Sequence, residues 1–279
     1  MKLPFTKMQG LGNDFVVLDF VRHPVSLSNS QFSHIADRRF GVGCDQILIV
    51  EPSDEDNIDF RYRIVNADGS EVGQCGNGAR CLVKFVREQG LTDKTIVNVS
   101  TSTSDMTLQA NDDGSVTVDM GKVSFDPASV PFIADAMQDM YPVEIDNNGQ
   151  KQTIEIAIAN IGNPHCLLLV DDIDTAEVDR IGPQIESHER FPEKVNVGFM
   201  QMISPNEIKL RVYERGAGET MACGSGACAA AAMGQNLGLL CDNVEVHLPG
   251  GPLHIQRTDN GNVLMTGAAE FSFTGEIQL

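Results

Sequence analysis

Residues 66–81 read Asn-Ala-Asp-Gly-Ser-Glu-Val-Gly-Gln-Cys-Gly-Asn-Gly-Ala-Arg-Cys, a stretch in which Cys75 stands directly before a glycine-rich helix start. A similar stretch occurs at residues 214–228, where Cys223-Gly-Ser-Gly-Ala aligns with Cys75-Gly-Asn-Gly-Ala of the first stretch. The two cysteines are 148 positions apart. Two copies of one cysteine motif indicate an internal duplication, whose traces should extend along the chain.

The same spacing recurs elsewhere in the sequence. Asn13 stands 150 positions before Asn163, each of them after a glycine, and Gln46 stands 150 positions before Asn196. A length of 279 residues also suggests two domains, at about 150 residues each. We therefore expect two pseudo-symmetric lobes. The predicted boundaries are 1–120 with a returning final strand at 269–279 for the first lobe, and 121–268 for the second, with the connection within 121–150.

Hydrophobic periodicity and turn residues predict an α/β (α+β) fold. Ser28 forms a capping box for a helix that we expect to run to Phe40 and to end at Gly41. Each cysteine motif starts a helix, and the alanine-rich second one should be buried within its lobe. The predicted strands are 3–8, 15–20, 47–50, 58–64, 95–101, 106–110 and 116–120 in the first lobe, and 154–159, 166–170, one through 196 and 208–212 in the second.

The composition narrows the class of protein. The 39 acidic and 20 basic residues give a formal charge of -19, which repels phosphate backbones and argues against nucleic-acid binding. No stretch approaches the ~20 apolar residues that span a bilayer, and no signal-like segment opens the chain. Seven cysteines without a Cys-x-x-Cys pair favour free thiols in a reducing compartment. We expect a soluble, cytoplasmic protein that binds neither nucleic acid nor membranes.

Cys75 and Cys223 are the candidate catalytic residues. The helix dipole and unpaired backbone N–H groups favour the anionic form of a thiol beside a helix N-terminus by roughly 0.3 to 2 kcal/mol. The amides of Gly76-Asn77 and Gly224-Ser225 open the two predicted helices and suit a bound carboxylate. Two equivalent thiols can act on opposite faces of one carbon, one removing a proton and the other delivering one. The pattern therefore predicts a stereochemical inversion of an acid.

Polar residues at matching positions of both halves predict a shared substrate pocket. Their amide side chains supply both hydrogen-bond donors and acceptors. Arg215 breaks the symmetry, and a single guanidinium suits a second carboxylate of the substrate. His165 and Glu214 are the titratable candidates to tune the thiols. The amide residues of the set are Asn13, Gln46, Asn66, Asn163 and Asn196.

These motifs resemble those of the diaminopimelate epimerase family from end to end of the chain. The resemblance is carried by the 66–80 motif, by Gly-Asn-Pro-His at 162–165 and by Glu-Arg-Gly-Ala-Gly-Glu-Thr at 214–220, with further similarity at 10–15, 186–200 and 249–251. It implies an enzyme without cofactor or metal that interconverts LL- and meso-2,6-diaminopimelate in bacterial lysine and cell-wall precursor synthesis. It also implies two similar lobes, each a mixed sheet wrapped around a central helix.

The resemblance assigns roles to individual residues. In the LL-to-meso direction Cys75 is the implied proton donor and Cys223 the implied acceptor, while His165 and Glu214 modulate thiol ionisation. Phe273 stands where the family has a C-terminal aromatic residue implicated in a homodimer. The implied substrate contacts are Asn13, Gln46, Asn66, Gly76, Asn77, Asn163, Asn196, Glu214, Arg215, Gly224 and Ser225.

Three alternatives stand beside this interpretation. Another two-cysteine racemase of the same fold, such as one acting on proline, would share the lobes and the chemistry but would not need Arg215. A thiol redox or metal-binding protein is disfavoured because the paired cysteines lie far apart and His and Cys lack zinc-ligand spacing. A pure binding module would have no use for activated thiols.

Overall fold

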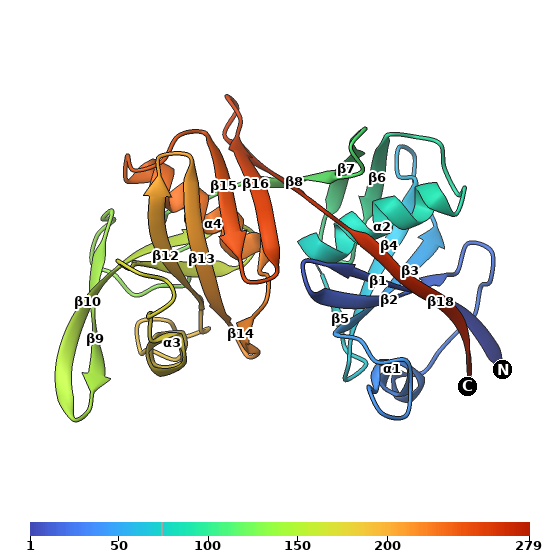
Figure 1. Cartoon of the computed structure of the whole chain (residues 1–279), viewed down its shortest axis with the longest axis horizontal. Coiled ribbons are helices and arrows are strands. Elements are labelled where there is room, and N and C mark those ends of the chain that lie inside the picture. Colours follow the sequence, from blue (N-terminus) through green and yellow to red (C-terminus); the bar gives the residue numbers. More distant parts are fainter. Residues whose placement is uncertain (74) are drawn as a thin grey trace. The chain divides into compact units, whose positions relative to one another are not determined.

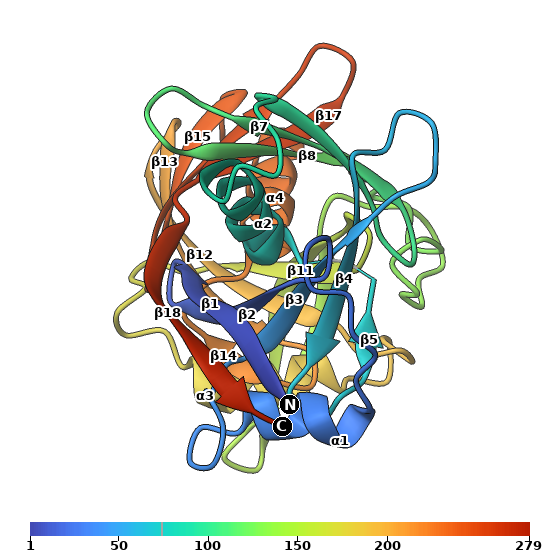
Figure 2. The same ribbon diagram turned by 90° about the vertical axis from the view of Figure 1, so that its right-hand side faces the viewer.

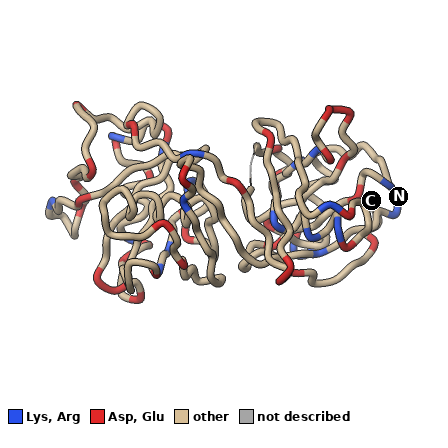
Figure 3. The backbone as a smooth tube through the Cα atoms, turned by 90° about the horizontal axis from the view of Figure 1, so that it is seen from above, with Lys and Arg blue, Asp and Glu red and all other residues tan. Residues whose placement is uncertain are grey.

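A computed structural model describes residues 1–73 and 75–279 of the chain. The chain divides into two compact units (Figure 1). Unit 1 comprises Met1–Asp119 together with Thr266–Leu279, and unit 2 comprises Met120–Met265. Figure 3 shows that Asp and Glu residues occur throughout both units rather than in one segment. In the part of the chain described, no helix is long and apolar enough to cross a membrane.

Unit 1 is a mixed sheet around one buried helix. The helix α2 (Gly76–Glu88) packs against β1, β2, β3 and β7, and Figure 2 shows it surrounded by strands. In the sheet, β2 pairs parallel with β3 and β4 pairs parallel with β6, whereas the other pairs of this unit are antiparallel. The strands are β1 (Lys2–Gly10), β2 (Asn13–Asp19), β3 (Gln46–Pro52), β4 (Phe60–Asn66), β5 (Glu71–Val72), β6 (Ile96–Ser100), β7 (Asp105–Ala110), β8 (Val116–Lys122) and β18 (Glu270–Gln278).

Unit 2 repeats this architecture around the helix α4 (Gly224–Asn236). Ten of the thirteen residues of α4 are buried, including the run Ala229–Ala232, because small side chains let the surrounding strands approach closely. A shorter helix, α3 (Val178–Glu186), lies outside against β12 and β13. The strands are β9 (Tyr141–Asn147), β10 (Gln150–Asn160), β11 (Pro164–Leu169), β12 (Asn196–Ser204), β13 (Glu207–Glu214), β14 (Gly218–Thr220), β15 (Asn243–Leu248), β16 (Gly251–Arg257) and β17 (Asn262–Gly267).

Strand register confirms the predicted duplication. In unit 1, β2–β3 is a parallel pair, β3–β4 an antiparallel pair and β4–β6 a parallel pair. In unit 2 the corresponding pairs β11–β12, β12–β13 and β13–β15 have the same order. An Arg–Glu ion pair also recurs at the same place in both units. Arg63 binds Glu71 through two nitrogens at 3.1 and 3.0 Å, and Arg211 binds Glu219 at 2.6 and 2.8 Å. The matching register pairs are Phe15 with Gln46 and His165 with Asn196, Ile64 with Val72 and Val212 with Thr220, and Phe60 with Val99 and Ile208 with Val246.

The first helix, α1 (Asn29–Ala36), is shorter than predicted. Ser28 forms the expected capping box at its start. The helix ends at Ala36 rather than Phe40, because Asp37 leaves the helical conformation and its side chain accepts the backbone N–H groups of the next turn, at 2.7 and 2.8 Å. Side-chain oxygens of this kind compete with the helical ladder.

A further difference from the prediction concerns a strand. Strand β9 lies in the segment 121–150, which we expected to hold an irregular connection. Its residues Tyr141, Val143 and Ile145 are buried and belong to the hydrophobic core of unit 2, which explains their alternation with polar residues. At the other end of the chain, the predicted returning strand is present, since β18 pairs antiparallel with β1 along its length.

Candidate active site

Both paired cysteines are the N-cap residues of the central helices. Cys75 has an extended backbone, and its Sγ accepts the N–H of Gly78 at 3.3 Å. Cys223 is equivalent: its Sγ accepts the N–H of Gly226 at 3.4 Å. Each sulfur therefore lies where the unpaired backbone N–H groups of a helix converge. Gly76 and Gly224 are the first residues of these helices, as the sequence pattern indicates.

In unit 1, Asn13 lies directly beside Cys75. The Oδ1 atom of Asn13 is 3.9 Å from Cys75 Sγ and accepts a hydrogen bond from Asn77 Nδ2 at 3.3 Å. Asn13 donates in turn to Asp45 at 2.8 Å, which fixes the direction of its amide. Three residues from β2, the N-cap and α2 thus form one polar group around the thiol.

Gln46 and Asn66 form a second pair in unit 1. They lie opposite each other on β3 and β4, and Gln46 Nε2 donates to Asn66 Oδ1 at 3.0 Å. The amide nitrogen of Asn66 donates to Ser70 Oγ at 3.1 Å. Both side chains are half-buried, so they have polar atoms within reach of a ligand as well as of each other.

An ion cluster that the sequence analysis did not identify supports Asn13. Asp14 binds Lys7 at 2.6 Å and Arg38 at 2.6 Å, and Arg38 also binds Asp45, the acceptor of Asn13. Burial opposes ionisation of Asp14, but Arg38 and Lys7 together hold its pKa well below the ordinary value. The cluster is contributed by β1, β2 and the segment after α1, which are distant in sequence, so no local spacing pointed to it.

In unit 2, His165, Asn163 and Ser225 gather beside Cys223. His165 Nε2 is 2.9 Å from Asn163 Oδ1 and 3.1 Å from Ser225 Oγ, and Asn163 Nδ2 donates to that Oγ at 3.2 Å. Ser225 Oγ is 3.6 Å from Cys223 Sγ. The serine therefore connects the buried imidazole to the thiol, at the position where unit 1 has Asn77.

The remaining predicted residues of unit 2 lie at the ends of β12 and β13. Asn196 is buried; it donates to Pro164 O at 2.8 Å and accepts the backbone N–H of Arg215 at 2.9 Å. Glu214 accepts the hydroxyl of Thr220. The exposed Arg215 donates to Glu193 O at 3.1 Å. Within this unit the structure thus gathers Asn163, His165, Ser225 and Cys223, and anchors Asn196 and Arg215 to each other.

Glu186, at the end of α3, was also missed by the sequence analysis. It is buried, and its Oε1 accepts the N–H of Gly216 at 2.7 Å, which holds the turn that carries Arg215. A single glutamate in a helix gives no signal in the sequence that distinguishes it from a solvated one. Its role became visible only from its burial beside a glycine turn.

Burial dominates the ionisation of Cys223. It raises the pKa of the thiol well above the ordinary value, and Glu214 raises it further, whereas the bonds from Ser225 and Gly226 lower it. The helix N-terminus therefore acts in the predicted direction but is outweighed by the loss of water around a fully buried sulfur. A thiol of this kind is protonated at neutral pH and is strongly basic once it has lost its proton.

The buried imidazole of His165 should make the protein less stable in mild acid. Burial, with Arg215 nearby, lowers its pKa from 6.5 to about 3, so between these values only the unfolded chain binds the proton. This contribution to stability is full above pH 6.5 and decreases as the pH falls, by about 2 kcal/mol between pH 7 and pH 5. The His165→Gln variant has no imidazole at this position, so its stability should not decrease by this amount between pH 7 and pH 5. Urea unfolding at pH 7 and pH 5 measures the free energy of unfolding of both proteins. An equal decrease in the parent chain and in the variant would contradict the assignment to His165.

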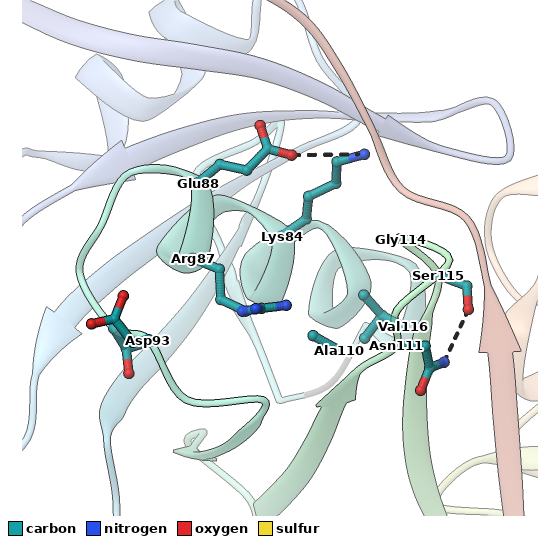
Figure 4. Close-up of a pocket in the computed structure, with 10 residues that line it drawn as sticks. Lys84, Arg87, Glu88, Asp93, Ala110, Asn111, Gly114, Ser115 and Val116 are labelled. Atoms are coloured by element: carbon teal, nitrogen blue, oxygen red, sulfur yellow. Dashed lines mark hydrogen bonds and ion pairs between the residues drawn. The ribbon is translucent and has the colours of Figure 1, made fainter.

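A separate cavity of about 320 Å³ lies near the far end of α2 (Figure 4). Its walls are Lys84, Arg87 and Glu88 of α2 and the hairpin 110–116. Charges of both signs meet there, and Lys84 is 3.9 Å from Glu88. None of the predicted catalytic or substrate-contacting residues lines this cavity. Across the described residues, no cluster of His, Cys, Asp and Glu could hold a metal ion.

Phe273 lies on β18 of unit 1. Its side chain is half exposed, at 52%, and its ring meets the ring of Phe5 on β1 edge to face, with centroids 6.0 Å apart. The exposed Phe273 ring, with the half-buried Phe5 beside it, offers apolar surface to solvent.

Two like units, each with an N-cap cysteine and an amide-rich polar group, are the arrangement that the sequence motifs predict for an epimerase. The family model for diaminopimelate epimerase matches residues 5–126 and 157–272, and the chain belongs to this family. The diaminopimelate epimerase of Thioalkalivibrio sulfidiphilus (strain HL-EbGR7) is 54% identical over 282 residues, covering 100% of both chains.

Solved structures of lower identity share the fold. A phenazine biosynthesis protein of the PhzF family from Bacillus anthracis superposes with a TM-score of 0.70 at 14% identity, covering 100% of both chains. A hydroxyproline epimerase from Agrobacterium vitis, with bound trans-4-hydroxy-L-proline, gives a TM-score of 0.67 at 14% identity, covering 99% of this chain and 92% of the other. At such identities the likeness concerns the fold alone.

Proposed function

We propose that this protein interconverts LL- and meso-2,6-diaminopimelate by inverting one α-carbon, with no cofactor. The observation that carries the proposal is the pair of cysteines at identical N-cap positions of two duplicated units. Membership in the diaminopimelate epimerase family supports the same substrate. The product would serve lysine and cell-wall precursor synthesis.

The proposed mechanism gives each thiol one face of the substrate carbon. In the LL-to-meso direction the Cys223 thiolate removes the α-proton, and the Cys75 thiol delivers a proton from the opposite side. The roles exchange in reverse. Burial raises the pKa of Cys223, which makes its thiolate a stronger base, and a strong base is what a weakly acidic α-hydrogen requires. Neutral His165, linked to Cys223 through Ser225, and Glu214 would modulate this ionisation.

Recognition of the substrate is proposed to combine helix N-termini with amides. The backbone N–H groups at Gly76-Asn77 and Gly224-Ser225 would hold the carboxylate at the reacting carbon. Arg215 would bind the distal carboxylate, since its guanidinium is exposed on a turn anchored by Asn196 and Glu186. The other proposed contacts are Asn13, Gln46, Asn66, Asn163, Asn196 and Glu214.

A second candidate function is racemisation of a smaller amino acid by the same two-thiol chemistry. The fold that this chain shares with the hydroxyproline epimerase supports this second candidate. Arg215 discriminates between the two, because a substrate with one carboxylate offers no second anion for its guanidinium.

We also propose that the protein is a cytoplasmic homodimer that binds no nucleic acid. The exposed ring of Phe273, packed against the half-buried Phe5, supports a subunit contact at β18, and the net charge of -19 disfavours phosphate backbones. Sedimentation equilibrium of the purified chain measures the oligomeric state, and a monomer at every concentration would contradict the dimer.

A stereochemical assay tests the proposed function. LL-diaminopimelate is incubated with the purified protein, a reductant and no added cofactor, and the isomers are separated after derivatisation with a chiral reagent. We expect meso product to accumulate toward an equilibrium mixture. Parallel reactions with L-proline and trans-4-hydroxy-L-proline should show no inversion. Inversion of either of these, but not of diaminopimelate, would favour the second candidate.

A further inference from the structure

Tyr62 has a buried hydroxyl group that makes no hydrogen bond to the described residues of the fold. Its side chain, on β4, has no solvent exposure, and its Oη atom has no hydrogen-bond partner among the described residues. A buried polar group left without a partner costs about 1–3 kcal/mol. A phenylalanine would fill the same volume without that cost.

The hydroxyl lies against the first turn of α2, beside the Cys75 thiol. A Cβ atom built on Gly78 would stand 2.3 Å from Tyr62 Oη and 3.4 Å from Cys75 Sγ. The same point is 3.0 Å from Leu48 Cδ2, so the surroundings of the hydroxyl are otherwise apolar. The absent side chain of Gly78 is thus what allows the phenol to approach the turn that begins at Cys75.

The second unit has no phenol at this place, and the hydroxyl beside Cys223 is that of Ser225, on the helix itself. In the duplicated register Leu210 of β13 corresponds to Tyr62 of β4, and the space beside Gly226 is bordered by Val212 and by Cys223 itself. Both units keep a glycine at this position of the helix, yet only unit 1 places a hydrogen-bond donor there. The phenol therefore distinguishes Cys75 from Cys223.

We propose that Tyr62 is a positioning residue whose hydroxyl donates a hydrogen bond to the sulfur of Cys75 when that sulfur is a thiolate. The proposal rests on the role given to Cys75 in the proposed function. A thiolate attracts a donor much more strongly than a neutral thiol does, because the hydrogen bond becomes charge-assisted.

The phenol is available as a donor at every pH at which the enzyme would work. Burial raises its pKa well above 10, and the nearby sulfurs of Cys75 and Cys81 act in the same direction, so it keeps its proton. The other titratable groups around this turn are Cys81 and Arg80, both on α2. Burial raises the pKa of Cys81 to about 12, so it stays neutral, and the Arg80 guanidinium donates to Ala268 O at 3.0 Å.

Alkylation of individual cysteines in Tyr62→Phe tests the proposal. The full chain is treated with iodoacetamide from pH 6 to pH 10, and the rate at each cysteine is measured by mass spectrometry of its peptide. We expect the pH midpoint for Cys75 to rise by about one unit, which slows its alkylation at pH 7.5 by about three- to tenfold. The profile of the exposed Cys241 should not change.

Tyr141→Phe is the matched control, since Tyr141 is equally buried but lies in unit 2 and accepts the N–H of Gln138. It should leave the Cys75 profile unchanged. An unchanged Cys75 profile in Tyr62→Phe, or an equal shift at Cys75 and Cys241, would overturn the proposal. Because alkylation requires no turnover, this result is independent of whether diaminopimelate proves to be the substrate.

Discussion

Cys75→Ser and Cys223→Ser should each lower the rate of epimerisation by at least about a thousandfold, because each removes one of the two groups that transfer a proton. Serine retains the N-cap hydrogen bond to Gly78 or Gly226, so the helices keep their starts. A hydroxyl is far too weak an acid to replace the thiol. Initial rates from LL-diaminopimelate and, for the reverse direction, from meso-diaminopimelate measure the effect.

The controls separate loss of chemistry from loss of fold. Cys241→Ser changes an exposed cysteine outside the helix starts and should retain full activity. Circular dichroism and urea unfolding of both catalytic variants should match the parent chain within about 1 kcal/mol, as expected when an N-cap is conserved. Near-normal turnover in either variant would eliminate the two-thiol assignment, even if the chain remained an epimerase.

Reaction in deuterated water should label nearly every molecule of product from the first turnover. The proton that Cys223 removes is not the one that Cys75 returns, and Cys75 exchanges its proton with solvent before it reacts. Starting from LL-diaminopimelate, the meso product should carry one deuterium at the inverted carbon, and recovered LL substrate should stay largely unlabelled. Mass spectrometry at low conversion measures both.

The carbon at the other end of the substrate is the internal control for this experiment, since it takes no part in proton transfer and should keep its hydrogen. A single base that works from one side would return part of the original hydrogen to the product. Early meso product without deuterium would therefore exclude two independent thiols.

The local sequence was sufficient to predict those features of the fold that neighbouring residues determine. The N-cap placement of Cys75 and Cys223 follows from a cysteine that precedes Gly-x-Gly at a helix start, and in the structure each helix begins at the residue after its cysteine. The constant offset between the halves likewise predicted two similar units, and in the structure matching strands pair in matching register. The roles of individual site residues stay predictions until the variants are measured.

The sequence was insufficient to predict features that depend on a distant contact or on competition between two local contacts. The end of α1 depends on whether Asp37 captures the next backbone N–H groups or stays helical, and propensity does not settle that choice. Glu186 and Tyr62 look like an ordinary helix residue and an ordinary strand residue. Their significance comes from partners, or from the lack of one, that only the three-dimensional arrangement places beside them.

The pairing of β18 with β1 has a consequence for the order of folding during synthesis. Unit 1 contains both Met1–Asp119 and Thr266–Leu279, and Lys2 pairs with Gln278. The ribosome makes residues 266–279 only after all of unit 2, so the nascent first unit must wait with the edge of β1 uncovered while the second unit can already complete its own sheet. An unpaired strand edge is the feature through which nascent chains aggregate. The edge of β1 is therefore covered only when β18, the strand made last among those described, pairs with it.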